Sequence, residues 1–157
     1  MNQIAHIFLT YFILSFIIPE TQKYLLPIAI FAIILDIDHV PSYIRMLFIS
    51  KKTRSKMKLM NYINLFRTAI QEPIGIITIE LMLLTFYLFG VKSIYIVIAM
   101  FSIVIHWMID FLTVHTRPFD PINKKVFCLF FKTKKQRFVS EIVITGISAI
   151  LFVKVYF

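Results

Sequence analysis

Long apolar runs separated by short polar links dominate the hydrophobic pattern of this chain. Five such runs cover about residues 4–18, 24–40, 73–90, 93–114 and 139–156. A membrane-spanning helix usually needs about 20 apolar residues, with ~17 at the low end, so the last four runs are long enough to cross a bilayer. The first run is shorter and is bounded by Pro19. Because lipid offers no partners to backbone polar groups, membrane insertion predicts helices for all five runs.

The composition agrees with membrane insertion. The chain has 157 residues, of which 59% are hydrophobic and only 16% are charged. A soluble domain carries about half apolar and about a quarter charged residues. We therefore expect an all-α, polytopic helical membrane protein, with about five membrane-embedded helices in one bundle and residues 1–157 forming a single domain. The single cysteine, Cys128, excludes an internal disulfide and a thiolate metal cluster.

The basic residues are concentrated in two links, at about 45–67 and 115–138, which hold 14 of the 17 lysines and arginines. Both links follow an even-numbered apolar run, so both lie on one side of the membrane. The positive-inside rule assigns that side to the cytoplasm and predicts a cytoplasmic N-terminus in the inner, plasma membrane. The net charge of +9 thus has a topological explanation. We expect anionic lipid headgroups, rather than nucleic acid, to be its partner.

Ligand-type side chains occur at or near the cytoplasmic ends of four of these runs. Charge inside a span is costly and normally marks a cavity, a partner or a function. Carboxylates and imidazoles together suit Zn²⁺, and also Mn²⁺ or Fe. The sequence therefore predicts a site for one or two divalent ions, most simply zinc, built from His6, Asp36, Asp38, His39, Glu72, His106 and Asp110.

The spacing of these residues adds detail. His106 and Asp110 are four residues apart, and Asp36 and His39 are three apart, so each pair shares a helix face. Two or three protein ligands per ion, with open positions for water, are typical of catalytic metal sites. Two ions a few ångströms apart could be bridged by one aspartate and could hold a phosphoryl group between them.

Asp38 is the candidate for a bridging ligand or general base. Pro41 disfavours a helical conformation at Val40, so we expect the helix to end there. Asp38 would then either swing towards the other ligands or cap a turn.

Each residue also has a structural interpretation. A His-x-x-x-Asp pair can be a packing hydrogen bond, and Glu72 before Pro73 suits a helix start through the helix dipole. The convergence of several such residues on one membrane face favours a shared site over separate interfacial positions.

Further polar residues lie near the same face. Arginine binds phosphate in a bidentate fashion, so Arg67 and Arg117 are candidates for holding an anionic headgroup. Glu80, deeper in the third run, and His115, after the fourth, have roles that the sequence leaves open.

At this point the chain resembles the membrane-bound metal-dependent hydrolase family of bacteria and archaea. The resemblance covers about residues 1–122 and rests on the early His6, the Asp-Ile-Asp-His stretch at 36–39, and the His-x-x-x-Asp pair at 106–110 followed by Leu-Thr. That family is distantly similar to zinc-dependent phospholipases C and nucleases. The resemblance implies a metal-dependent hydrolase.

The stretch NLFRTAIQEPIGI departs from the family pattern. Typical members carry a His-Arg and then a His-Ser before the third span, whereas this chain has Phe66-Arg67 and Gln71-Glu72. Glu72 can replace a histidine ligand, but the other histidine is missing. A degenerate member that binds metal without turnover would fit the same residues.

The function expected from the sequence is hydrolysis of a phosphoester in a lipid or another amphiphile at the cytoplasmic leaflet, by a metal-activated water. Asp38, Arg67 and Arg117 would act on substrate or water, and the predicted ligands would hold the ions. The alternative is a small metal-ion or proton transporter, which Glu80 favours as an acid deep in a span. The sequence does not indicate an oligomeric state.

Overall fold

The computed structural model of the protein describes residues 3–41, 44, 48, 72–113, 130 and 134–157. This part of the chain is all-helical, without a strand. Its elements, in chain order, are α1 (Gln3–Leu14), the 3₁₀ segment η1 (Thr21–Tyr24), α2 (Leu25–Ile33), the 3₁₀ segment η2 (Ile34–His39), α6 (Pro73–Leu88), α7 (Ile94–Thr113) and α8 (Lys134–Tyr156).

Each of the five apolar runs contains one α-helix, so the helix prediction is confirmed. Three boundaries differ from the hydrophobic pattern. Helix α2 ends at Ile33, and the rest of its run continues as η2. Helix α1 ends at Leu14, four residues before the end of its run, and α8 begins at Lys134, five residues before its run. The basic residues at the start of α8 are good helix formers, so the helix extends beyond the apolar segment.

The start of α6 and the link to α7 follow from local chemistry. Pro73 occupies the first helical turn, where its missing N–H costs nothing, and Glu72 before it is extended, with φ −87° and ψ 159°. Gly90 in the α6–α7 link has φ +107°, a conformation that residues with a Cβ rarely adopt.

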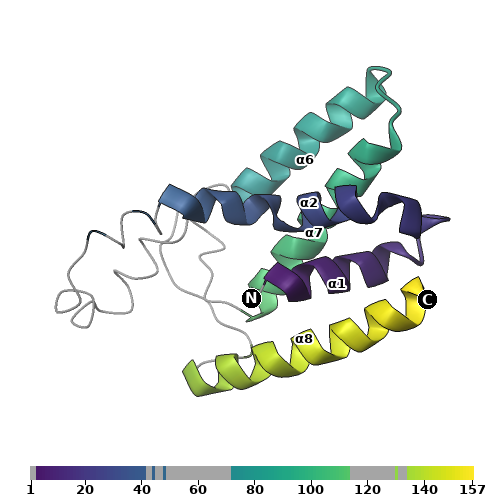
Figure 1. The fold of residues 1–157 in the computed structure, drawn as a ribbon. Coiled ribbons are helices and arrows are strands. Elements are labelled where there is room, and N and C mark those ends of the chain that lie inside the picture. Colours follow the sequence, from purple (N-terminus) through teal and green to yellow (C-terminus); the bar gives the residue numbers. More distant parts are fainter. Residues whose placement is uncertain (1–2, 42–43, 45–47, 49–71, 114–129, 131–133) are drawn as a thin grey trace.

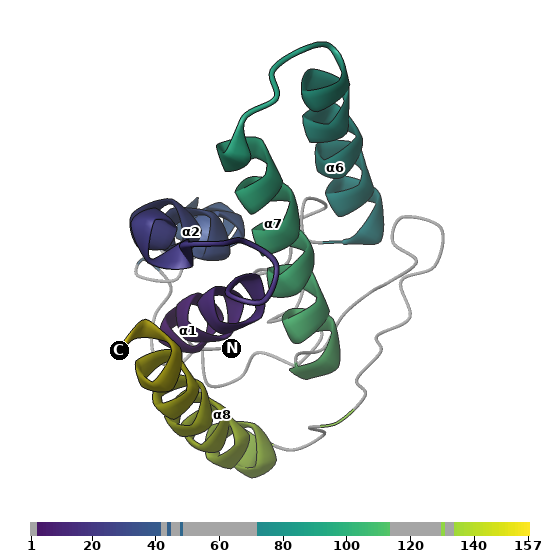
Figure 2. The same cartoon turned by 90° about the vertical axis from the view of Figure 1, so that its right-hand side faces the viewer.

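Several helix termini lie together at one end of the helix assembly (Figure 1). Helices α1 and α8 run side by side in the same direction, and α2 runs back alongside α1. The α6–α7 hairpin crosses them obliquely, as Figure 2 shows from the side. The starts of α1, α6 and α8 and the ends of η2 and α7 lie at the left in Figure 1, which we call the gathering end.

Apolar side chains fill the space between α1, α2 and α7. Leu14, Ile28 and Ile98 are fully buried and belong to one core cluster with Tyr11. Helix α8 packs on α1 through an aromatic contact, in which Phe152 meets the ring of Tyr11 edge-on at 4.8 Å. This core extends along α7 to Ile105 and Ile109, next to the polar residues of the gathering end.

Two helices, α7 and residues Phe138–Tyr156 of α8, are long and apolar enough to cross a membrane. The other described helices are shorter. The 12 residues of α1 span roughly 18 Å, and the 16 of α6 roughly 24 Å, against a hydrocarbon core of about 30 Å. The all-helical class is therefore confirmed, whereas the arrangement of five spans in one bundle stays a prediction.

Candidate metal centre

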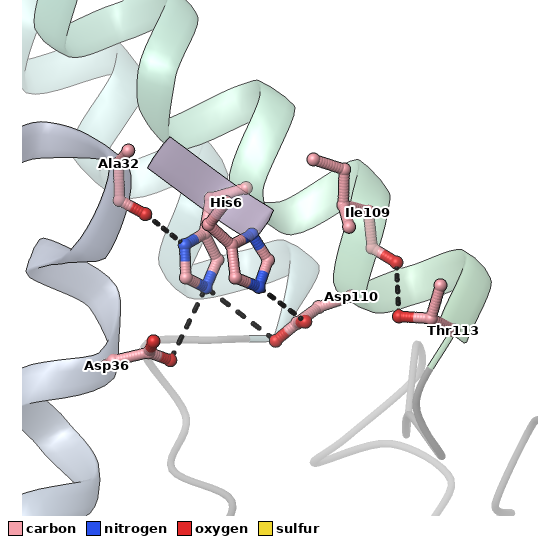
Figure 3. A network of polar contacts seen from close by, with 7 residues as sticks. His6, Ala32, Asp36, Ile109, Asp110 and Thr113 are labelled. Carbon is pink, nitrogen blue, oxygen red and sulfur yellow. Dashed lines mark hydrogen bonds and ion pairs between the residues drawn. The ribbon is translucent and has the colours of Figure 1, made fainter. Parts of the chain in front are cut away.

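His106 is held by a contact between two helices. It lies on α7, its side chain is 1% exposed, and its Nδ1 lies 2.5 Å from the carbonyl oxygen of Ala32 in α2 (Figure 3). A carbonyl oxygen can only accept, so Nδ1 carries the proton and donates this hydrogen bond. The proton on Nδ1 leaves Nε2 as the free ligand atom of the neutral ring.

That free nitrogen faces two carboxylates. The Nε2 atom of His106 is 3.6 Å from Oδ1 of Asp36 and 3.7 Å from Oδ2 of Asp110. Carboxylate oxygens and an unprotonated Nε2 all present lone pairs, and three such atoms repel unless positive charge lies among them. The arrangement therefore requires either a proton on Nε2 or a cation close to it.

His6 reaches the same place from the first turns of α1. Its ring stacks on that of His106, with centroids 3.9 Å apart and planes 8° apart, and its Nε2 lies 3.2 Å from Oδ1 of Asp110. The His6 side chain is completely buried. Within the described part of the chain, neither ring nitrogen of His6 has a partner with hydrogen-bond geometry, so the contact with Asp110 is one of charge and proximity.

His6, His106 and Asp110 could hold a metal ion. One ligand atom from each lies within 4.8 Å of the others. Zinc bonds of about 2.0–2.1 Å in a tetrahedron put neighbouring ligand atoms roughly 3.3–3.4 Å apart. The nitrogen–oxygen separations here, from 3.2 to 3.7 Å, bracket that value.

The histidine side of the centre is buried, and the carboxylate side is partly exposed. The side chains of Asp36 and Asp110 are 12% and 13% exposed, whereas both imidazoles are buried. In Figure 3 these two carboxylates lie on either side of the ring nitrogens. The carboxylate side is thus the more exposed side of the centre.

Backbone geometry places Asp36. The helix tightens from α to 3₁₀ at Ile34, and this turn carries Asp36 next to His106. The helical geometry therefore changes at Ile34, before Asp38, whereas we expected the change at Val40, after Asp38. Our prediction that Pro41 moves Val40 out of the helical region is wrong, because Val40 has φ −55° and ψ −47°. The preference of a residue before proline is outweighed there by continuation of the helical backbone.

The structure brings together four of the seven predicted ligands: His6, Asp36, His106 and Asp110. Glu72 lies at the gathering end and is 3% exposed, but it is not part of the group of close ligand atoms.

The backbone of Asp38 and His39 belongs to η2, and their side chains lie outside the described structure. Arg67, Arg117 and His115 lie outside the described residues. Glu80 lies in α6, with a buried Oε1.

Sequence reasoning missed three groups near the centre. One is the carbonyl of Ala32, which no side-chain pattern reveals. The others are Thr10 and Ser102, whose side chains are fully buried and whose hydroxyl groups have no hydrogen-bond partner among the described residues. Thr10 follows His6 by four residues and Ser102 precedes His106 by four, so helical periodicity could have identified both.

No known protein family, curated protein or solved structure matches this chain. The family resemblance drawn from the motif residues stays a prediction. The chemistry of the centre rests on its own geometry.

Proposed function

We propose that the protein is an integral membrane, metal-dependent hydrolase that cleaves a phosphoester of a lipid or another amphiphile at the cytoplasmic leaflet. The observation that carries the proposal is the group of His6, His106 and Asp110, whose ligand atoms face one another in a buried site with Asp36 at its border. Helices α1 and α7 supply this group, and η2 supplies Asp36. Its imidazole and carboxylate chemistry suits zinc, with manganese and iron as the alternatives.

The outer surface of the helices supports membrane insertion. Helix α8 is apolar along most of its length, yet only 6% of its most apolar stretch is buried. A core helix of a soluble protein would be mostly buried, so this surface needs an apolar solvent instead. Its exposed apolar side chains include Phe138, Ile142, Ile147, Ile150 and Val153.

The proposed topology combines the helix directions with the basic links. If each apolar run crosses or enters the bilayer, the gathering end lies at the side of both basic links, which the positive-inside rule makes cytoplasmic. His6, Asp36 and Asp110 would then lie close to the inner headgroups. A substrate whose reacting group sits at headgroup depth could reach them without leaving the membrane.

The residues have distinct roles in this proposal. A divalent ion in the centre would lower the pKa of a bound water towards neutrality and polarise a phosphoryl oxygen. His6, His106, Asp110 and Asp36 would hold one or two such ions, and the carbonyl of Ala32 would fix the ring of His106. Hydrolysis adds the oxygen of water to phosphorus, breaks the bond to the alcohol and leaves the proton with the alcohol.

The remaining candidates keep the roles that the sequence suggested. Asp38 is proposed to remove the proton from water or to bridge two ions. Arg67 and Arg117 are proposed to bind the anionic headgroup, since the fork of a guanidinium matches two phosphate oxygens. The resemblance to the metal-dependent membrane hydrolases supports this assignment, and the departure at Phe66–Glu72 makes a metal-binding protein without turnover its closest competitor.

Purified protein in lipid nanodiscs, loaded with zinc, tests the proposal. We expect release of a phosphorylated headgroup or free phosphate from anionic phospholipid in the nanodiscs, and loss of both zinc and turnover in His106→Ala. Ser102→Ala, on the same helix one turn away, is the matched control and should retain both. Full turnover after complete removal of metal would refute the mechanism.

A transport function is the second candidate. Glu80 favours it, because an acid in the middle of the apolar helix α6 has a buried oxygen without a hydrogen-bond partner in the described structure. The hydroxyls of Thr10 and Ser102 extend the polar region one turn beyond the histidines. Leu14 and Ile98 are fully buried in the core beyond them, which argues against a continuous polar path. Metal flux into proteoliposomes without any lipid hydrolysis would favour transport.

A further inference from the structure

As they are oriented, the planes of the two imidazole rings do not meet at one ion. The rings of His6 and His106 lie face to face, with centroids 3.9 Å apart and planes only 8° apart. An ion bound to an imidazole nitrogen lies close to the plane of that ring, in line with the nitrogen lone pair. Two nearly parallel planes do not meet inside the site. A single ion held by both rings would therefore require one ring to swing out of the stack.

The carboxylate of Asp110 is divided between the two rings. Its Oδ1 atom lies 3.2 Å from Nε2 of His6, and its Oδ2 atom lies 3.7 Å from Nε2 of His106. A carboxylate that ligates one ion with one oxygen and a second ion with the other has this arrangement. Both oxygens of Asp110 could then bind ions without any movement of the two imidazole rings.

Asp36 distinguishes the two positions. Its Oδ1 atom is 3.6 Å from Nε2 of His106, and Asp36 does not belong to the mutually close group that contains His6. The position beside His106 thus has one nitrogen and two carboxylate oxygens. The position beside His6 has one nitrogen and one carboxylate oxygen, so it keeps more sites for water or substrate.

Two carboxylates lie close to the two ring nitrogens, at separations of 3.2 to 3.7 Å. Cations between these atoms would neutralise the carboxylates and use the ring nitrogens as ligands.

We propose that the centre binds two divalent ions, one beside His6 and one beside His106, with Asp110 bridging them and Asp36 ligating only the second. The inference rests on the proposed metal centre and specifies its number of ions and its bridging ligand. Ions bound in the planes of two rings whose centroids are 3.9 Å apart could approach the spacing of about 3.5–4 Å at which two ions hold the attacking and leaving oxygens of a phosphoryl group. Such a pair suits the phosphoester substrate of the proposed function.

Manganese provides a test that does not depend on activity. The full chain in nanodiscs is loaded with Mn²⁺ alone, the metal content is measured by mass spectrometry, and the spin coupling is measured by electron paramagnetic resonance. We expect two Mn²⁺ per chain with an exchange-coupled spectrum. Asp110→Asn should abolish the coupling, and His6→Gln should leave one uncoupled Mn²⁺ per chain.

Controls and outcomes separate this inference from the proposed function. Thr10→Val and Ser102→Ala should keep two coupled ions, and circular dichroism with gel filtration verifies that each variant is folded. If Asp110→Asn does not fold, His6→Gln still tests the pair. One uncoupled Mn²⁺ per wild-type chain would overturn the two-ion centre while leaving a one-ion hydrolase intact. Two coupled ions without any turnover would uphold the centre and defeat the hydrolase proposal. No bound Mn²⁺ would defeat both.

Discussion

His106 of α7 donates a hydrogen bond to the backbone carbonyl of Ala32 in α2, a residue 74 positions earlier in the chain. The contact joins two helices and determines which ring nitrogen faces the carboxylates. Buried donors of this kind also contribute to stability, by about 0.5–1.5 kcal/mol net. In His106, Nδ1 thus has a structural role and Nε2 is the ligand atom, so substitutions can test the two roles separately.

Asparagine at position 106 should keep the structural role and remove the ligand. Its side-chain NH₂ can occupy the place of Nδ1 and donate to Ala32, whereas nothing replaces Nε2. We expect His106→Asn to lower metal affinity by at least about 100-fold, since loss of even an outer partner costs about 10–100-fold. Isothermal titration with Zn²⁺ measures the affinity. Without metal, His106→Asn should unfold at a higher temperature than His106→Ala. Equal metal affinity in the wild type and His106→Asn would contradict the assignment of Nε2 as a ligand.

Metal should stabilise the folded chain. The ligand atoms of His6, His106 and Asp110 are brought together only by folding, so an ion that binds there shifts the equilibrium towards the native state. At a free zinc concentration 100 times Kd, the gain is about 2.7 kcal/mol. A chelator should lower the unfolding temperature and added Zn²⁺ should restore it. Asp110→Asn should respond less, and an unchanged unfolding temperature in the wild type would speak against the site.

Gly90 and Gly146 should respond to alanine in opposite directions. Gly90 has φ +107°, and Gly90→Ala should destabilise the α6–α7 link by about 1–3 kcal/mol through backbone strain. Gly146 is helical, and a Cβ there would meet no atom within 4 Å, so Gly146→Ala should be neutral or stabilising by up to about 1 kcal/mol. Unfolding in detergent measures both, and a stabilising Gly90→Ala would contradict the conformation of the link.

Helix α8 should not tolerate a charge at its exposed middle. Ile147 is 54% exposed on an apolar helix, and in a bilayer that face would contact lipid. We expect Ile147→Lys to cost about 2.5–3.5 kcal/mol of insertion free energy. A glycosylation-based insertion assay measures this cost. Phe157→Lys, beyond the end of the helix, is the matched control and should insert normally, and equal insertion of both variants would place α8 outside the membrane.

The topology can be read from thiol accessibility. Cys128→Ser removes the native thiol, after which single cysteines report on each side of the membrane. Ser93→Cys, in the link between α6 and α7, should react with a membrane-impermeant maleimide in intact cells. Ser55→Cys, in the first basic link, should react only after the cells are opened. The reverse pattern would invert the orientation and place the metal centre on the outer face.

Much of the fold could be predicted because its determinants are local. Hydropathy located one helix in each apolar run, and the Glu72-Pro73 pair indicated where α6 begins. The extension of α8 to Lys134 was missed, since basic residues that suit a helix leave no trace in an apolar pattern. The end of the second run was also misjudged, because Val40 stays helical where the proline rule predicted otherwise.

Part of the centre followed from spacing as well. The four-residue separation puts His106 and Asp110 on one face of α7, and alternating helix directions suggested that His6 and Asp36 would meet them. Residues at the same depth can nevertheless face different sides of a bundle. Glu72 is buried at the gathering end, yet it is not part of the group of close ligand atoms.

The sequence alone determined an all-helical chain with one helix in each of five apolar runs and a set of ligand-type residues at or near the helix ends. Only the tertiary structure decided that His6 stacks on His106, that Asp110 offers one oxygen to each ring, and that a backbone carbonyl fixes one tautomer. The reason is physical. Periodicity fixes which residues share a face of one helix, but the rotation of each helix about its axis is set by how side chains of different helices pack.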